Sequence, residues 1–282
     1  MMLPRLIATD LDGTLLRADG TVSQRTLDAL RTAIGAGVEI VVVTARPPRY
    51  LDALVAAAGL TGTAVCSNGA LVYDIASRTV VESRALSVAA ARTVADAVAG
   101  AVEGVGFAVE TGHRVFIEPG YRPRLTRDTG AESPVRALTD LWTLDVPIVK
   151  LLAYSARHDA DFLVAAAEES ASGTAQFTHS GGRGLLEISA PGVTKAGTLA
   201  KLCAERGVAA ADVYAFGDMP NDLTILNWAG TGYAMGNAHA SVRAAVARHT
   251  ASNEEDGVAV VIERLFESCS RAPADTRSDV GV

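Results

Sequence analysis

Apolar residues follow two alternating patterns over residues 1–66. Short, nearly continuous apolar runs are typical of strands that are buried on both faces of a sheet. Between them lie segments with apolar residues on one helical face, and the first of these begins at Ser23, a residue type favoured as an N-cap. The predicted strands are 3–9, 38–43 and 63–66, and the predicted helices are one with Leu27, Leu30 and Ile34 on its apolar face and one over 49–58. Strand–helix–strand repetition at this spacing predicts right-handed crossovers and a parallel sheet.

The pattern changes after residue 66, where Asn68-Gly69 predicts a turn that leads into a hairpin of 70–74 and 79–83. Within 84–188 the predicted helices are 87–99 and 159–170, and the predicted strands are 105–110, 114–118, 146–154, 174–178 and 185–189. After Pro191-Gly192, predicted helices 194–206, 220–228, 239–247 and 257–267 alternate with predicted strands 212–217 and 231–235. This organisation predicts an α/β protein with a doubly wound parallel sheet formed by residues 1–83 and 189–282, and an α+β domain inserted at 84–188.

Composition narrows the class of protein. The chain has 282 residues, of which 49 % are hydrophobic, so it can bury a sizeable core. No apolar run reaches the roughly 18 residues that span a bilayer, and the N-terminus does not resemble a signal peptide. We therefore expect a cytoplasmic protein with no membrane partner, in which the three cysteines are reduced. The net charge of −7 disfavours nucleic acid as a partner but permits a small anionic substrate, and nothing in the sequence determines an oligomeric state.

The most informative motif is Asp10-Leu11-Asp12-Gly13-Thr14-Leu15, which follows the first predicted strand. In open parallel sheets, ligands bind outside the carboxyl ends of the strands. The carboxylates of Asp10 and Asp12 can therefore point into one crevice, and Gly13 allows the chain to bend sharply. An Asp-x-Asp pair alone indicates no more than an acidic loop, but a chance match to five specified positions occurs in roughly one chain in ten thousand.

Three further motifs occur at predicted strand–helix junctions. Thr44 follows the second strand, where a hydroxyl can hold a phosphoryl oxygen, although a threonine there is more often a helix cap. Lys195 lies at the start of a helix and, taken alone, indicates only a solvated lysine. Asp218, Asn221 and Asp222 follow a later strand, and together they are more than a helix cap needs.

The four carboxylates of these motifs are expected to meet in one crevice. Crowding Asp10, Asp12, Asp218 and Asp222 is costly unless a cation lies among them. No histidine or cysteine ligand pattern accompanies them, and oxygen ligands alone indicate a hard ion. Mg²⁺ is the hard ion typical of phosphate chemistry, so we expect a magnesium cofactor.

These four motifs, in this order and with a large insert between the second and third, resemble those of the haloacid dehalogenase superfamily, and most closely its Cof-type sugar-phosphatase branch. Further landmarks of that branch resemble residues 66–70, 147–150, 186–188, 234–238 and 252–258. The resemblance implies a Rossmann-like core and a large α/β cap that closes over the substrate. The chain departs from the family at Ala45, where glycine is usual, and we expect so small a residue to preserve function.

Matched position by position, the resemblance implies a role for each motif. Asp10 would be the nucleophile that forms an aspartyl phosphate, and Asp12 the general acid that later activates water. The implied catalytic residues are Asp10, Asp12, Thr44 and Lys195, and the implied phosphate-binding residues are Thr44, Ala45, Arg46, Lys195 and Asn221. The implied Mg²⁺ ligands are the Asp10 carboxylate, the Asp12 backbone carbonyl and Asp218, supported by Asn221 and Asp222.

The favoured hypothesis is a Mg²⁺-dependent phosphatase that hydrolyses phosphate monoesters of small metabolites, with sugar phosphates as the first expectation. A phosphotransferase such as a hexose-phosphate mutase would use the same Asp10 chemistry but return the phosphoryl group to a sugar. A non-catalytic phosphate-binding module is disfavoured because every catalytic position is filled. Phosphonate or dehalogenase chemistry usually accompanies a different cap.

The five histidines are scattered and receive no catalytic role. His113 with Arg114, and His179 with Arg183, could face the crevice and meet substrate. A polar hairpin tip is the simpler interpretation of each pair.

Overall fold

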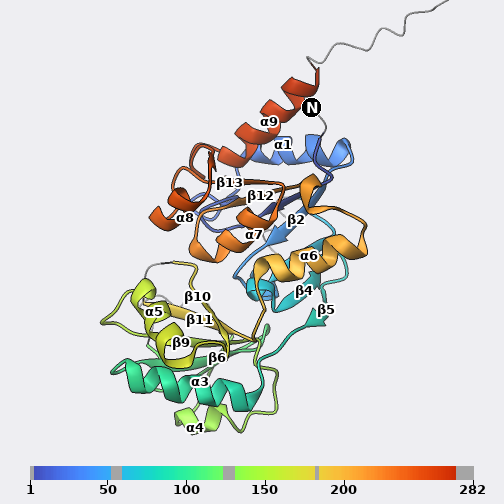
Figure 1. Ribbon diagram of the computed structural model, residues 1–282. Coiled ribbons are helices and arrows are strands. Elements are labelled where there is room, and N and C mark those ends of the chain that lie inside the picture. Colours follow the sequence, from blue (N-terminus) through green and yellow to red (C-terminus); the bar gives the residue numbers. More distant parts are fainter. Residues whose placement is uncertain (1–2, 52–58, 123–130, 182–183, 271–282) are drawn as a thin grey trace, which may run out of the picture.

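The computed structural model describes residues 3–51, 59–122, 131–181 and 184–270, which form two sheets, each with its own helices (Figure 1). The strands of the larger sheet are β1 (Leu6–Thr9), β2 (Glu39–Val43), β3 (Thr63–Cys66), β4 (Leu71–Asp74), β5 (Thr79–Ser83), β12 (Val213–Gly217), β13 (Thr231–Ala234) and β14 (Arg248–His249). Their order across the sheet is β14-β13-β12-β1-β2-β3-β4-β5. The pairs from β14 to β3 are parallel, whereas β4 and β5 are antiparallel additions at one edge.

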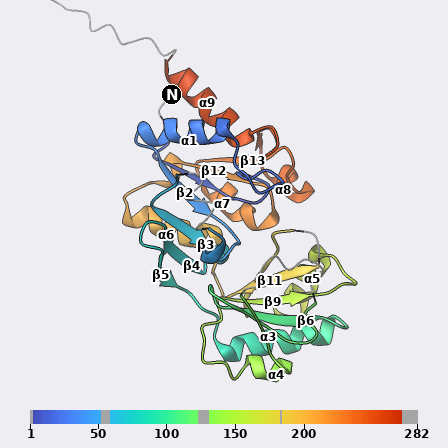
Figure 2. The same ribbon diagram turned by 180° about the vertical axis from the view of Figure 1, so that it is seen from behind.

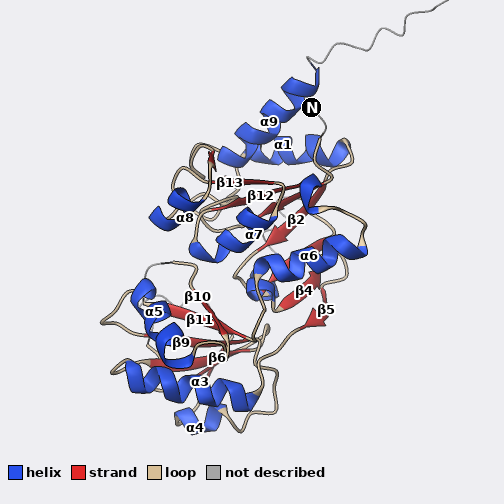
Figure 3. Cartoon of the chain, in the orientation of Figure 1, coloured by secondary structure: helices blue, strands red, loops and turns tan. Residues whose placement is uncertain are grey.

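Helices cover both faces of this sheet, as a doubly wound fold requires (Figures 1 and 3). Helices α1 (Gln24–Gly35) and α9 (Gly257–Ser270) pack together on one face. Helices α6 (Lys195–Glu205) and α7 (Leu223–Trp228) pack together on the other, and α8 (Ala240–Ala245) follows β13. Single 3₁₀ turns, each of three residues, occupy η1 (Pro48–Tyr50), η2 (Ser67–Gly69), η3 (Ala210–Asp212) and η4 (Pro220–Asp222). We call this part of the molecule the core.

The smaller sheet belongs to the inserted segment, which we call the cap. Its strands are β6 (Gly106–Glu110), β7 (Val115–Ile117), β8 (Glu132–Pro134), β9 (Lys150–Tyr154), β10 (Gln176–Thr178) and β11 (Leu185–Ser189), in the order β10-β11-β9-β6-β7-β8. Its helices are α3 (Val88–Ala101), α4 (Leu138–Leu141) and α5 (Ala160–Ala171). Helices α3 and α4 lie on the side away from the core in both views (Figures 1 and 2).

Alternation along the cap strands separates the two faces of the cap sheet, because successive side chains point to opposite sides. One set of apolar residues packs with the helices in a buried cluster: Phe107, Val109, Leu151, Ala153, Leu186 and Ile188. The alternate residues, which include Glu110, Lys150 and Leu152, point to the other face and line a cavity against the core. The cap therefore presents a mixed polar and apolar sheet face to the core.

The parallel core with an inserted α+β cap is confirmed, and most predicted elements occur within a few residues of their predicted bounds. The predicted apolar face of α1 is wrong at one position, because the buried stripe runs through Ala29, Leu30 and Ala33 while Ile34 is 45 % exposed. β9 begins at Lys150 rather than at residue 146, because Ile148 forms an isolated bridge to Leu86.

Three further differences concern short or partly described elements. Strand β8, helix α4 and strand β14 were not predicted, and all three are too short to show a periodicity. Most of the predicted helix 49–58 lies outside the described residues. β11 extends to Ser189, one residue beyond the predicted cap boundary of 84–188, which stays a prediction. Among the described residues, no helix combines the length and apolarity that crossing a membrane requires.

Candidate active site

Three adjacent parallel strands end at the site. Asp218 follows β12, Asp10 follows β1 and Thr44 follows β2, and these strands are neighbours in the order β12-β1-β2. The Asp10 backbone N–H donates to the Phe216 carbonyl (3.1 Å), which extends the β1–β12 pairing to Asp10 itself. Residues separated by about 200 positions therefore meet because the carboxyl ends of parallel strands share one edge of the sheet.

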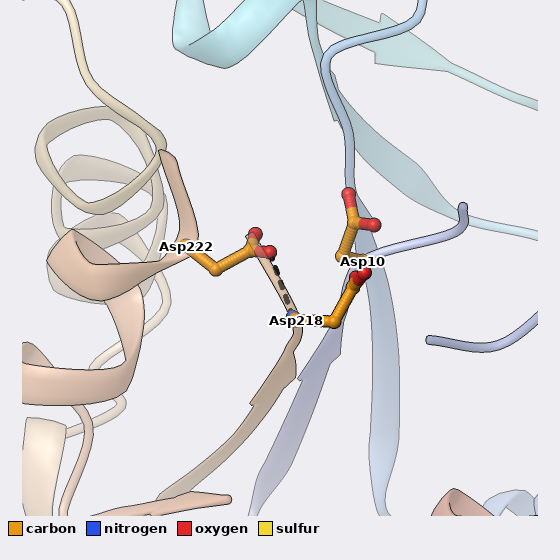
Figure 4. A group of neighbouring side chains, drawn as sticks. All are labelled: Asp10, Asp218 and Asp222. Atoms are coloured by element: carbon orange, nitrogen blue, oxygen red, sulfur yellow. Dashed lines mark hydrogen bonds between the residues drawn. The ribbon is translucent and has the colours of Figure 1, made fainter. Parts of the chain in front are cut away.

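Asp10, Asp218 and Asp222 form a buried carboxylate cluster, in which one oxygen of each lies within 4.8 Å of the others (Figure 4). The Thr14 hydroxyl donates to Asp218 Oδ1 (2.8 Å) and orients that carboxylate. Gly13 has a φ of +75°, and a Cβ at this position would overlap the Asp218 carboxylate. The glycine of the first motif is thus needed both for the turn and for this close approach.

Lys195 is the cation of the cluster and is almost fully buried. Its Nζ donates to Asp10 Oδ1 (2.6 Å) and to Asp222 Oδ1 (2.7 Å). Burial opposes the charged form, but the two carboxylates outweigh burial and hold the pKa of Lys195 above its ordinary value. Asp222 Oδ2 accepts from the backbone N–H groups of Asp218 and Met219, both at 3.0 Å, so both oxygens of Asp222 have partners. Asp222 therefore positions Lys195 and the turn rather than offering a free ligand oxygen.

The charges of this cluster do not balance. With every group ionised, three carboxylates and one ammonium sum to −2, the complement of one divalent cation. Burial and the neighbouring carboxylates raise the pKa of Asp10 well above its ordinary value, and burial together with Asp222 raises the pKa of Asp218 to about 7. Both shifts express the cost of crowding negative charge, which a hard cation bound through the oxygens of Asp10 and Asp218 would relieve. The residues present fit Mg²⁺.

Asp12 lies outside the carboxylate cluster, and its side chain is 52 % exposed. Arg46 holds it through two hydrogen bonds, from Nε to Oδ2 (2.6 Å) and from Nη2 to Oδ1 (2.5 Å). The bond to Asp12 raises the pKa of Arg46 above its ordinary value. Arg46, predicted to bind phosphate, therefore contacts the predicted general acid in this structure, and both line the cavity between core and cap.

Thr44 is buried, and its Oγ1 accepts from the Arg46 backbone N–H (3.0 Å). This bond leaves the Thr44 hydroxyl proton to be donated elsewhere. The Ala45 carbonyl accepts from Lys150 Nζ (2.9 Å), a cap residue with no role predicted from the sequence. The loop after β2 is therefore fixed from both sides, by Asp12 of the core and by Lys150 of the cap.

A chain of buried hydrogen bonds connects this loop to Asn221. Lys150 Nζ also donates to Glu187 Oε2 (2.5 Å), which accepts from Asn68 Nδ2 (2.9 Å). Asn68 Oδ1 in turn accepts from Asn221 Nδ2 (3.0 Å). Burial opposes the charge of Glu187, but Lys150 and the Ser180 hydroxyl outweigh burial and hold the pKa of Glu187 below its ordinary value. Asn221, predicted to support phosphate and metal, thus ties the core to the cap through Asn68.

A second cross-domain contact was also missed from the sequence. Arg49 of η1 donates from Nη1 and Nη2 to the two oxygens of Glu110 at the end of β6, both at 2.7 Å. The partners in these cap contacts are far apart in the sequence, so no local pattern could pair them. The only sequence signals near them were the family landmarks at 66–70, 147–150 and 186–188.

The histidine pairs do not meet the carboxylate cluster. His113 and Arg114 lie exposed at the turn between β6 and β7. His179 is buried, with Nε2 lying 2.9 Å from Asp161 Oδ1, and it lines a different cavity. Arg183 lies outside the described residues.

Comparison with known proteins agrees with this geometry. The family model for haloacid dehalogenase-like hydrolases matches residues 7–262. The 5-amino-6-(5-phospho-D-ribitylamino)uracil phosphatase YitU of Bacillus subtilis is 29 % identical, and the pyridoxal phosphate phosphatase YbhA of Escherichia coli is 27 % identical. Each alignment covers 93 % of this chain and 98 % of the relative. The solved structure of a haloacid dehalogenase-like hydrolase from Bacillus subtilis superposes with a TM-score of 0.79 at 23 % identity, over 93 % of this chain and 99 % of that one.

The family model spans both halves of the core and the cap between them, so the match includes all four motifs. The chain therefore belongs to the haloacid dehalogenase-like hydrolase family, in its Cof-type branch, and is a phosphoric monoester hydrolase.

Proposed function

We propose that this phosphatase is Mg²⁺-dependent, acts on phosphate monoesters of small metabolites in the cytoplasm, and works through an aspartyl phosphate on Asp10. The observation that supports this most is the contact of Lys195 with Asp10 inside a cluster of net charge −2. The relatives are named for a phosphorylated ribitylamino-uracil and for pyridoxal phosphate, and a sugar phosphate is a further candidate of similar size.

In the first step, an Asp10 carboxylate oxygen forms a bond to phosphorus, and the bond between phosphorus and the leaving oxygen breaks. A carboxylate that approaches a phosphate dianion meets charge repulsion, which Lys195 lowers because its ammonium lies 2.6 Å from Asp10 Oδ1. Bound Mg²⁺, held by Asp10, Asp218 and the Asp12 backbone carbonyl, would supply further positive charge to the transferring phosphoryl group. Thr44 has a hydroxyl proton available for a phosphoryl oxygen.

Asp12 serves both half-reactions in this proposal. It gives a proton to the departing alkoxide, and it then takes a proton from the water that attacks the aspartyl phosphate. In this structure Arg46 holds the ionised Asp12 carboxylate at the wall of the cavity through two hydrogen bonds. Asp12 must therefore leave Arg46 and take up a proton before it acts as the acid of the first step. The cap covers this cavity, which limits the access of bulk water before the leaving group departs.

The Asp12→Ala variant tests the intermediate directly. With p-nitrophenyl phosphate, whose leaving group is stable as an anion and needs no proton, we expect the variant to phosphorylate Asp10 and then to stall. The expected result is a burst of about one nitrophenolate per active site, followed by slow turnover, with phosphate found on Asp10 by mass spectrometry. A sugar phosphate should give no burst, because its alkoxide needs the missing acid.

Two variants serve as controls for this experiment. Asp10→Ala should give no burst with either substrate, and Asp28→Ala, an exposed carboxylate on α1, should behave as the wild type. The mechanism is wrong if the Asp12→Ala burst is equally large with a sugar phosphate, or if its steady-state rate matches that of the wild type.

A further inference from the structure

One cross-strand row of the cap sheet carries three charged residues. In the register of β8, β7, β6 and β9, Glu132 pairs with Val115, Val115 with Glu110, and Glu110 with Lys150. Residues paired in this way lie on one face of a sheet, and all four line the cavity of about 250 Å³ between core and cap. The row therefore forms part of the wall that an organic leaving group must contact.

The charged members of this row differ in their partners. Glu110 is bound to Arg49, and Lys150 is bound to Glu187 and to the Ala45 carbonyl. Glu132 is half-buried and has no hydrogen bond or ion pair with any residue that the structure describes. Of the charged side chains in the described wall, Asp12 and Arg46 also pair with each other, so the Glu132 carboxylate is the single charge without a counterpart.

The cavity that Glu132 lines also has apolar side chains in its wall. Val115, Ile117, Leu152 and Leu185 line the same cavity, and Tyr121 packs edge to face against Tyr154 at a centroid distance of 6.1 Å. Burial, with the charges of Glu187, Glu110 and Glu132, raises the pKa of Tyr121, so its phenol stays protonated. An apolar wall of this kind suits a ring face, and the small volume limits the organic group to a small one.

Filling this cavity would remove water from the Glu132 carboxylate. A carboxylate that loses water without gaining a hydrogen-bond donor or a cation is strongly disfavoured. A leaving group that brings only apolar atoms or acceptors to Glu132 therefore binds poorly, whereas an ammonium or an N–H group replaces the lost water with a charge-assisted bond.

We propose that Glu132 makes this enzyme select phosphate esters whose organic group combines an apolar ring face with a protonated amine or another nitrogen-bound hydrogen donor. The inference rests on the proposed function, since it concerns the leaving group of the same reaction. Glu132 is then a specificity-determining residue that contacts the substrate away from the transferring phosphoryl group.

Matched substrate pairs test this inference. Pyridoxamine 5′-phosphate and pyridoxine 5′-phosphate share a ring and differ in an aminomethyl in place of a hydroxymethyl group. Glucosamine 6-phosphate and glucose 6-phosphate make the same kind of exchange without a flat ring. We expect wild-type kcat/KM to favour the amine of the ring pair by about tenfold or more, and both ring compounds to be better substrates than both sugars.

Glu132→Gln removes the charge and keeps the shape, so it should bring the amine preference of the ring pair close to one. Glu169→Gln, an equal charge change on the exposed side of α5, should leave the preference unchanged. p-Nitrophenyl phosphate brings only a ring and a nitro acceptor to position 132, so Glu132→Gln should hydrolyse it at least as fast as the wild type. Glu169→Gln should hydrolyse it within about twofold of the wild-type rate.

Four outcomes would overturn the inference: a wild-type preference for the hydroxyl compound, the same amine preference in Glu132→Gln as in the wild type, better turnover of the sugars than of the ring compounds, or no turnover of the ring pair. Failure of the proposed function is a separate result, because it would appear as no Mg²⁺-dependent hydrolysis of p-nitrophenyl phosphate by the wild type.

Discussion

The role of Lys195 becomes clear only from the residues that surround it in the structure. From its own position in the sequence it could have been a solvated lysine, yet the structure buries it between Asp10 and Asp222. A buried ammonium is stable only with such partners, and the partners are equally dependent on it. At the scale of single residues, the site therefore consists of buried charges of opposite sign that stabilise one another.

Lys195→Met would remove the positive charge that pairs with Asp10 and Asp222. We expect kcat to fall by several orders of magnitude, because the cation beside the nucleophile is lost, and the free energy of unfolding to fall by about 3–5 kcal/mol. Without the lysine, the Asp10 carboxyl group, whose pKa burial already raises, should bind a proton more tightly still in the folded chain than in the unfolded chain. The loss of stability should therefore grow as pH rises, and urea unfolding at pH 5.5 and pH 8 would measure it.

Lys201→Met supplies the matched control for that variant. Lys201 lies on the same helix, α6, but its side chain is exposed and its ion pair with Glu82 is a surface contact. We expect a change of less than about 1 kcal/mol and full activity. Equal destabilisation by the two substitutions would contradict the role given to the buried lysine.

The raised pKa of Asp218 predicts how pH and Mg²⁺ affect the stability of the protein. Burial and the charge of Asp222 raise its pKa from 3.8 to about 7 in the metal-free protein. A raised folded-state pKa favours the folded state at low pH, so the metal-free protein should lose stability as pH rises from about 4 to about 7. The proposed Mg²⁺ would bind the ionised carboxylate, so the stabilisation that it gives should increase over the same range.

Thermal unfolding with EDTA or with Mg²⁺, at pH 5 and at pH 8, would measure this dependence. Asp218→Asn should flatten the pH profile and remove most of the Mg²⁺ effect. Ca²⁺ should stabilise the protein without supporting turnover, because it takes more ligands at longer distances. An Mg²⁺ effect of the same size at both pH values would show that Asp218 does not bind the ion.

At the scale of elements, the junctions between strands and helices could be predicted because their signals are local. Ser23 caps α1 and Thr194 caps α6, each accepting from a backbone N–H three residues on, and Asp10, Thr44 and Asp218 directly follow buried strands. Parallel strands then bring those ends together without further information. The placement of Ile34 was wrong because the buried stripe of α1 runs through Leu30 and two small alanines, Ala29 and Ala33, and does not follow the largest apolar side chains.

The contacts between cap and core could not be predicted in this way. Lys150 and Ala45 are 105 residues apart, and nothing in the local pattern of β9 indicates which of its faces meets another domain. In the sequence, Glu110 and Glu187 look like solvent-facing polar residues of strands, although in the structure both are buried in ion pairs. Such pairings depend on how the two sheets pack against each other, which the periodicity of a single strand does not encode.

Lys150→Met tests the weight of one such element contact. It would leave Glu187 buried without its cation, and we expect a loss of about 3–5 kcal/mol at neutral pH. The pKa of Glu187 is lowered in the wild type, so its contribution is present above its unfolded pKa of 4.5 and is lost as pH falls through the folded-state value. The difference between variant and wild type should therefore shrink toward pH 4.

The double variant Lys150→Met/Glu187→Gln separates charge from packing. A neutral amide at position 187 can still accept from Asn68, so we expect it to recover part of the lost stability at pH 7. Urea unfolding of the single and double variants at pH 7 and pH 4 would provide the comparison. No recovery at pH 7 would show that Lys150 acts through its contact with the Ala45 carbonyl instead.

At the scale of the whole molecule, the residues proposed for catalysis and those proposed to select the substrate belong to different sheets. Every residue of the carboxylate cluster, with Lys195 and Thr44, comes from the core. The cap supplies most of the wall of the cavity and two charged contacts that hold the loop after β2. This division predicts that the two properties can be separated experimentally.

Replacing residues 84–188 with a short linker should, where circular dichroism shows that the core still folds, spare slow hydrolysis of acetyl phosphate. This small substrate has a good leaving group and makes few contacts beyond its phosphoryl group, so the core residues suffice for it. The rate should nevertheless fall below that of the full chain, because the cap no longer fixes the Ala45 carbonyl and Arg49 or excludes water from the cavity. Discrimination among larger phosphate esters should disappear, since the wall that contacts their organic groups is gone, and kcat/KM across a panel of sugar and ring phosphates would measure it. Asp10→Ala in the capless protein should abolish the remaining acetyl phosphate hydrolysis, which excludes a contaminating phosphatase. A capless protein that ranks the panel as the full chain does would place specificity in the core.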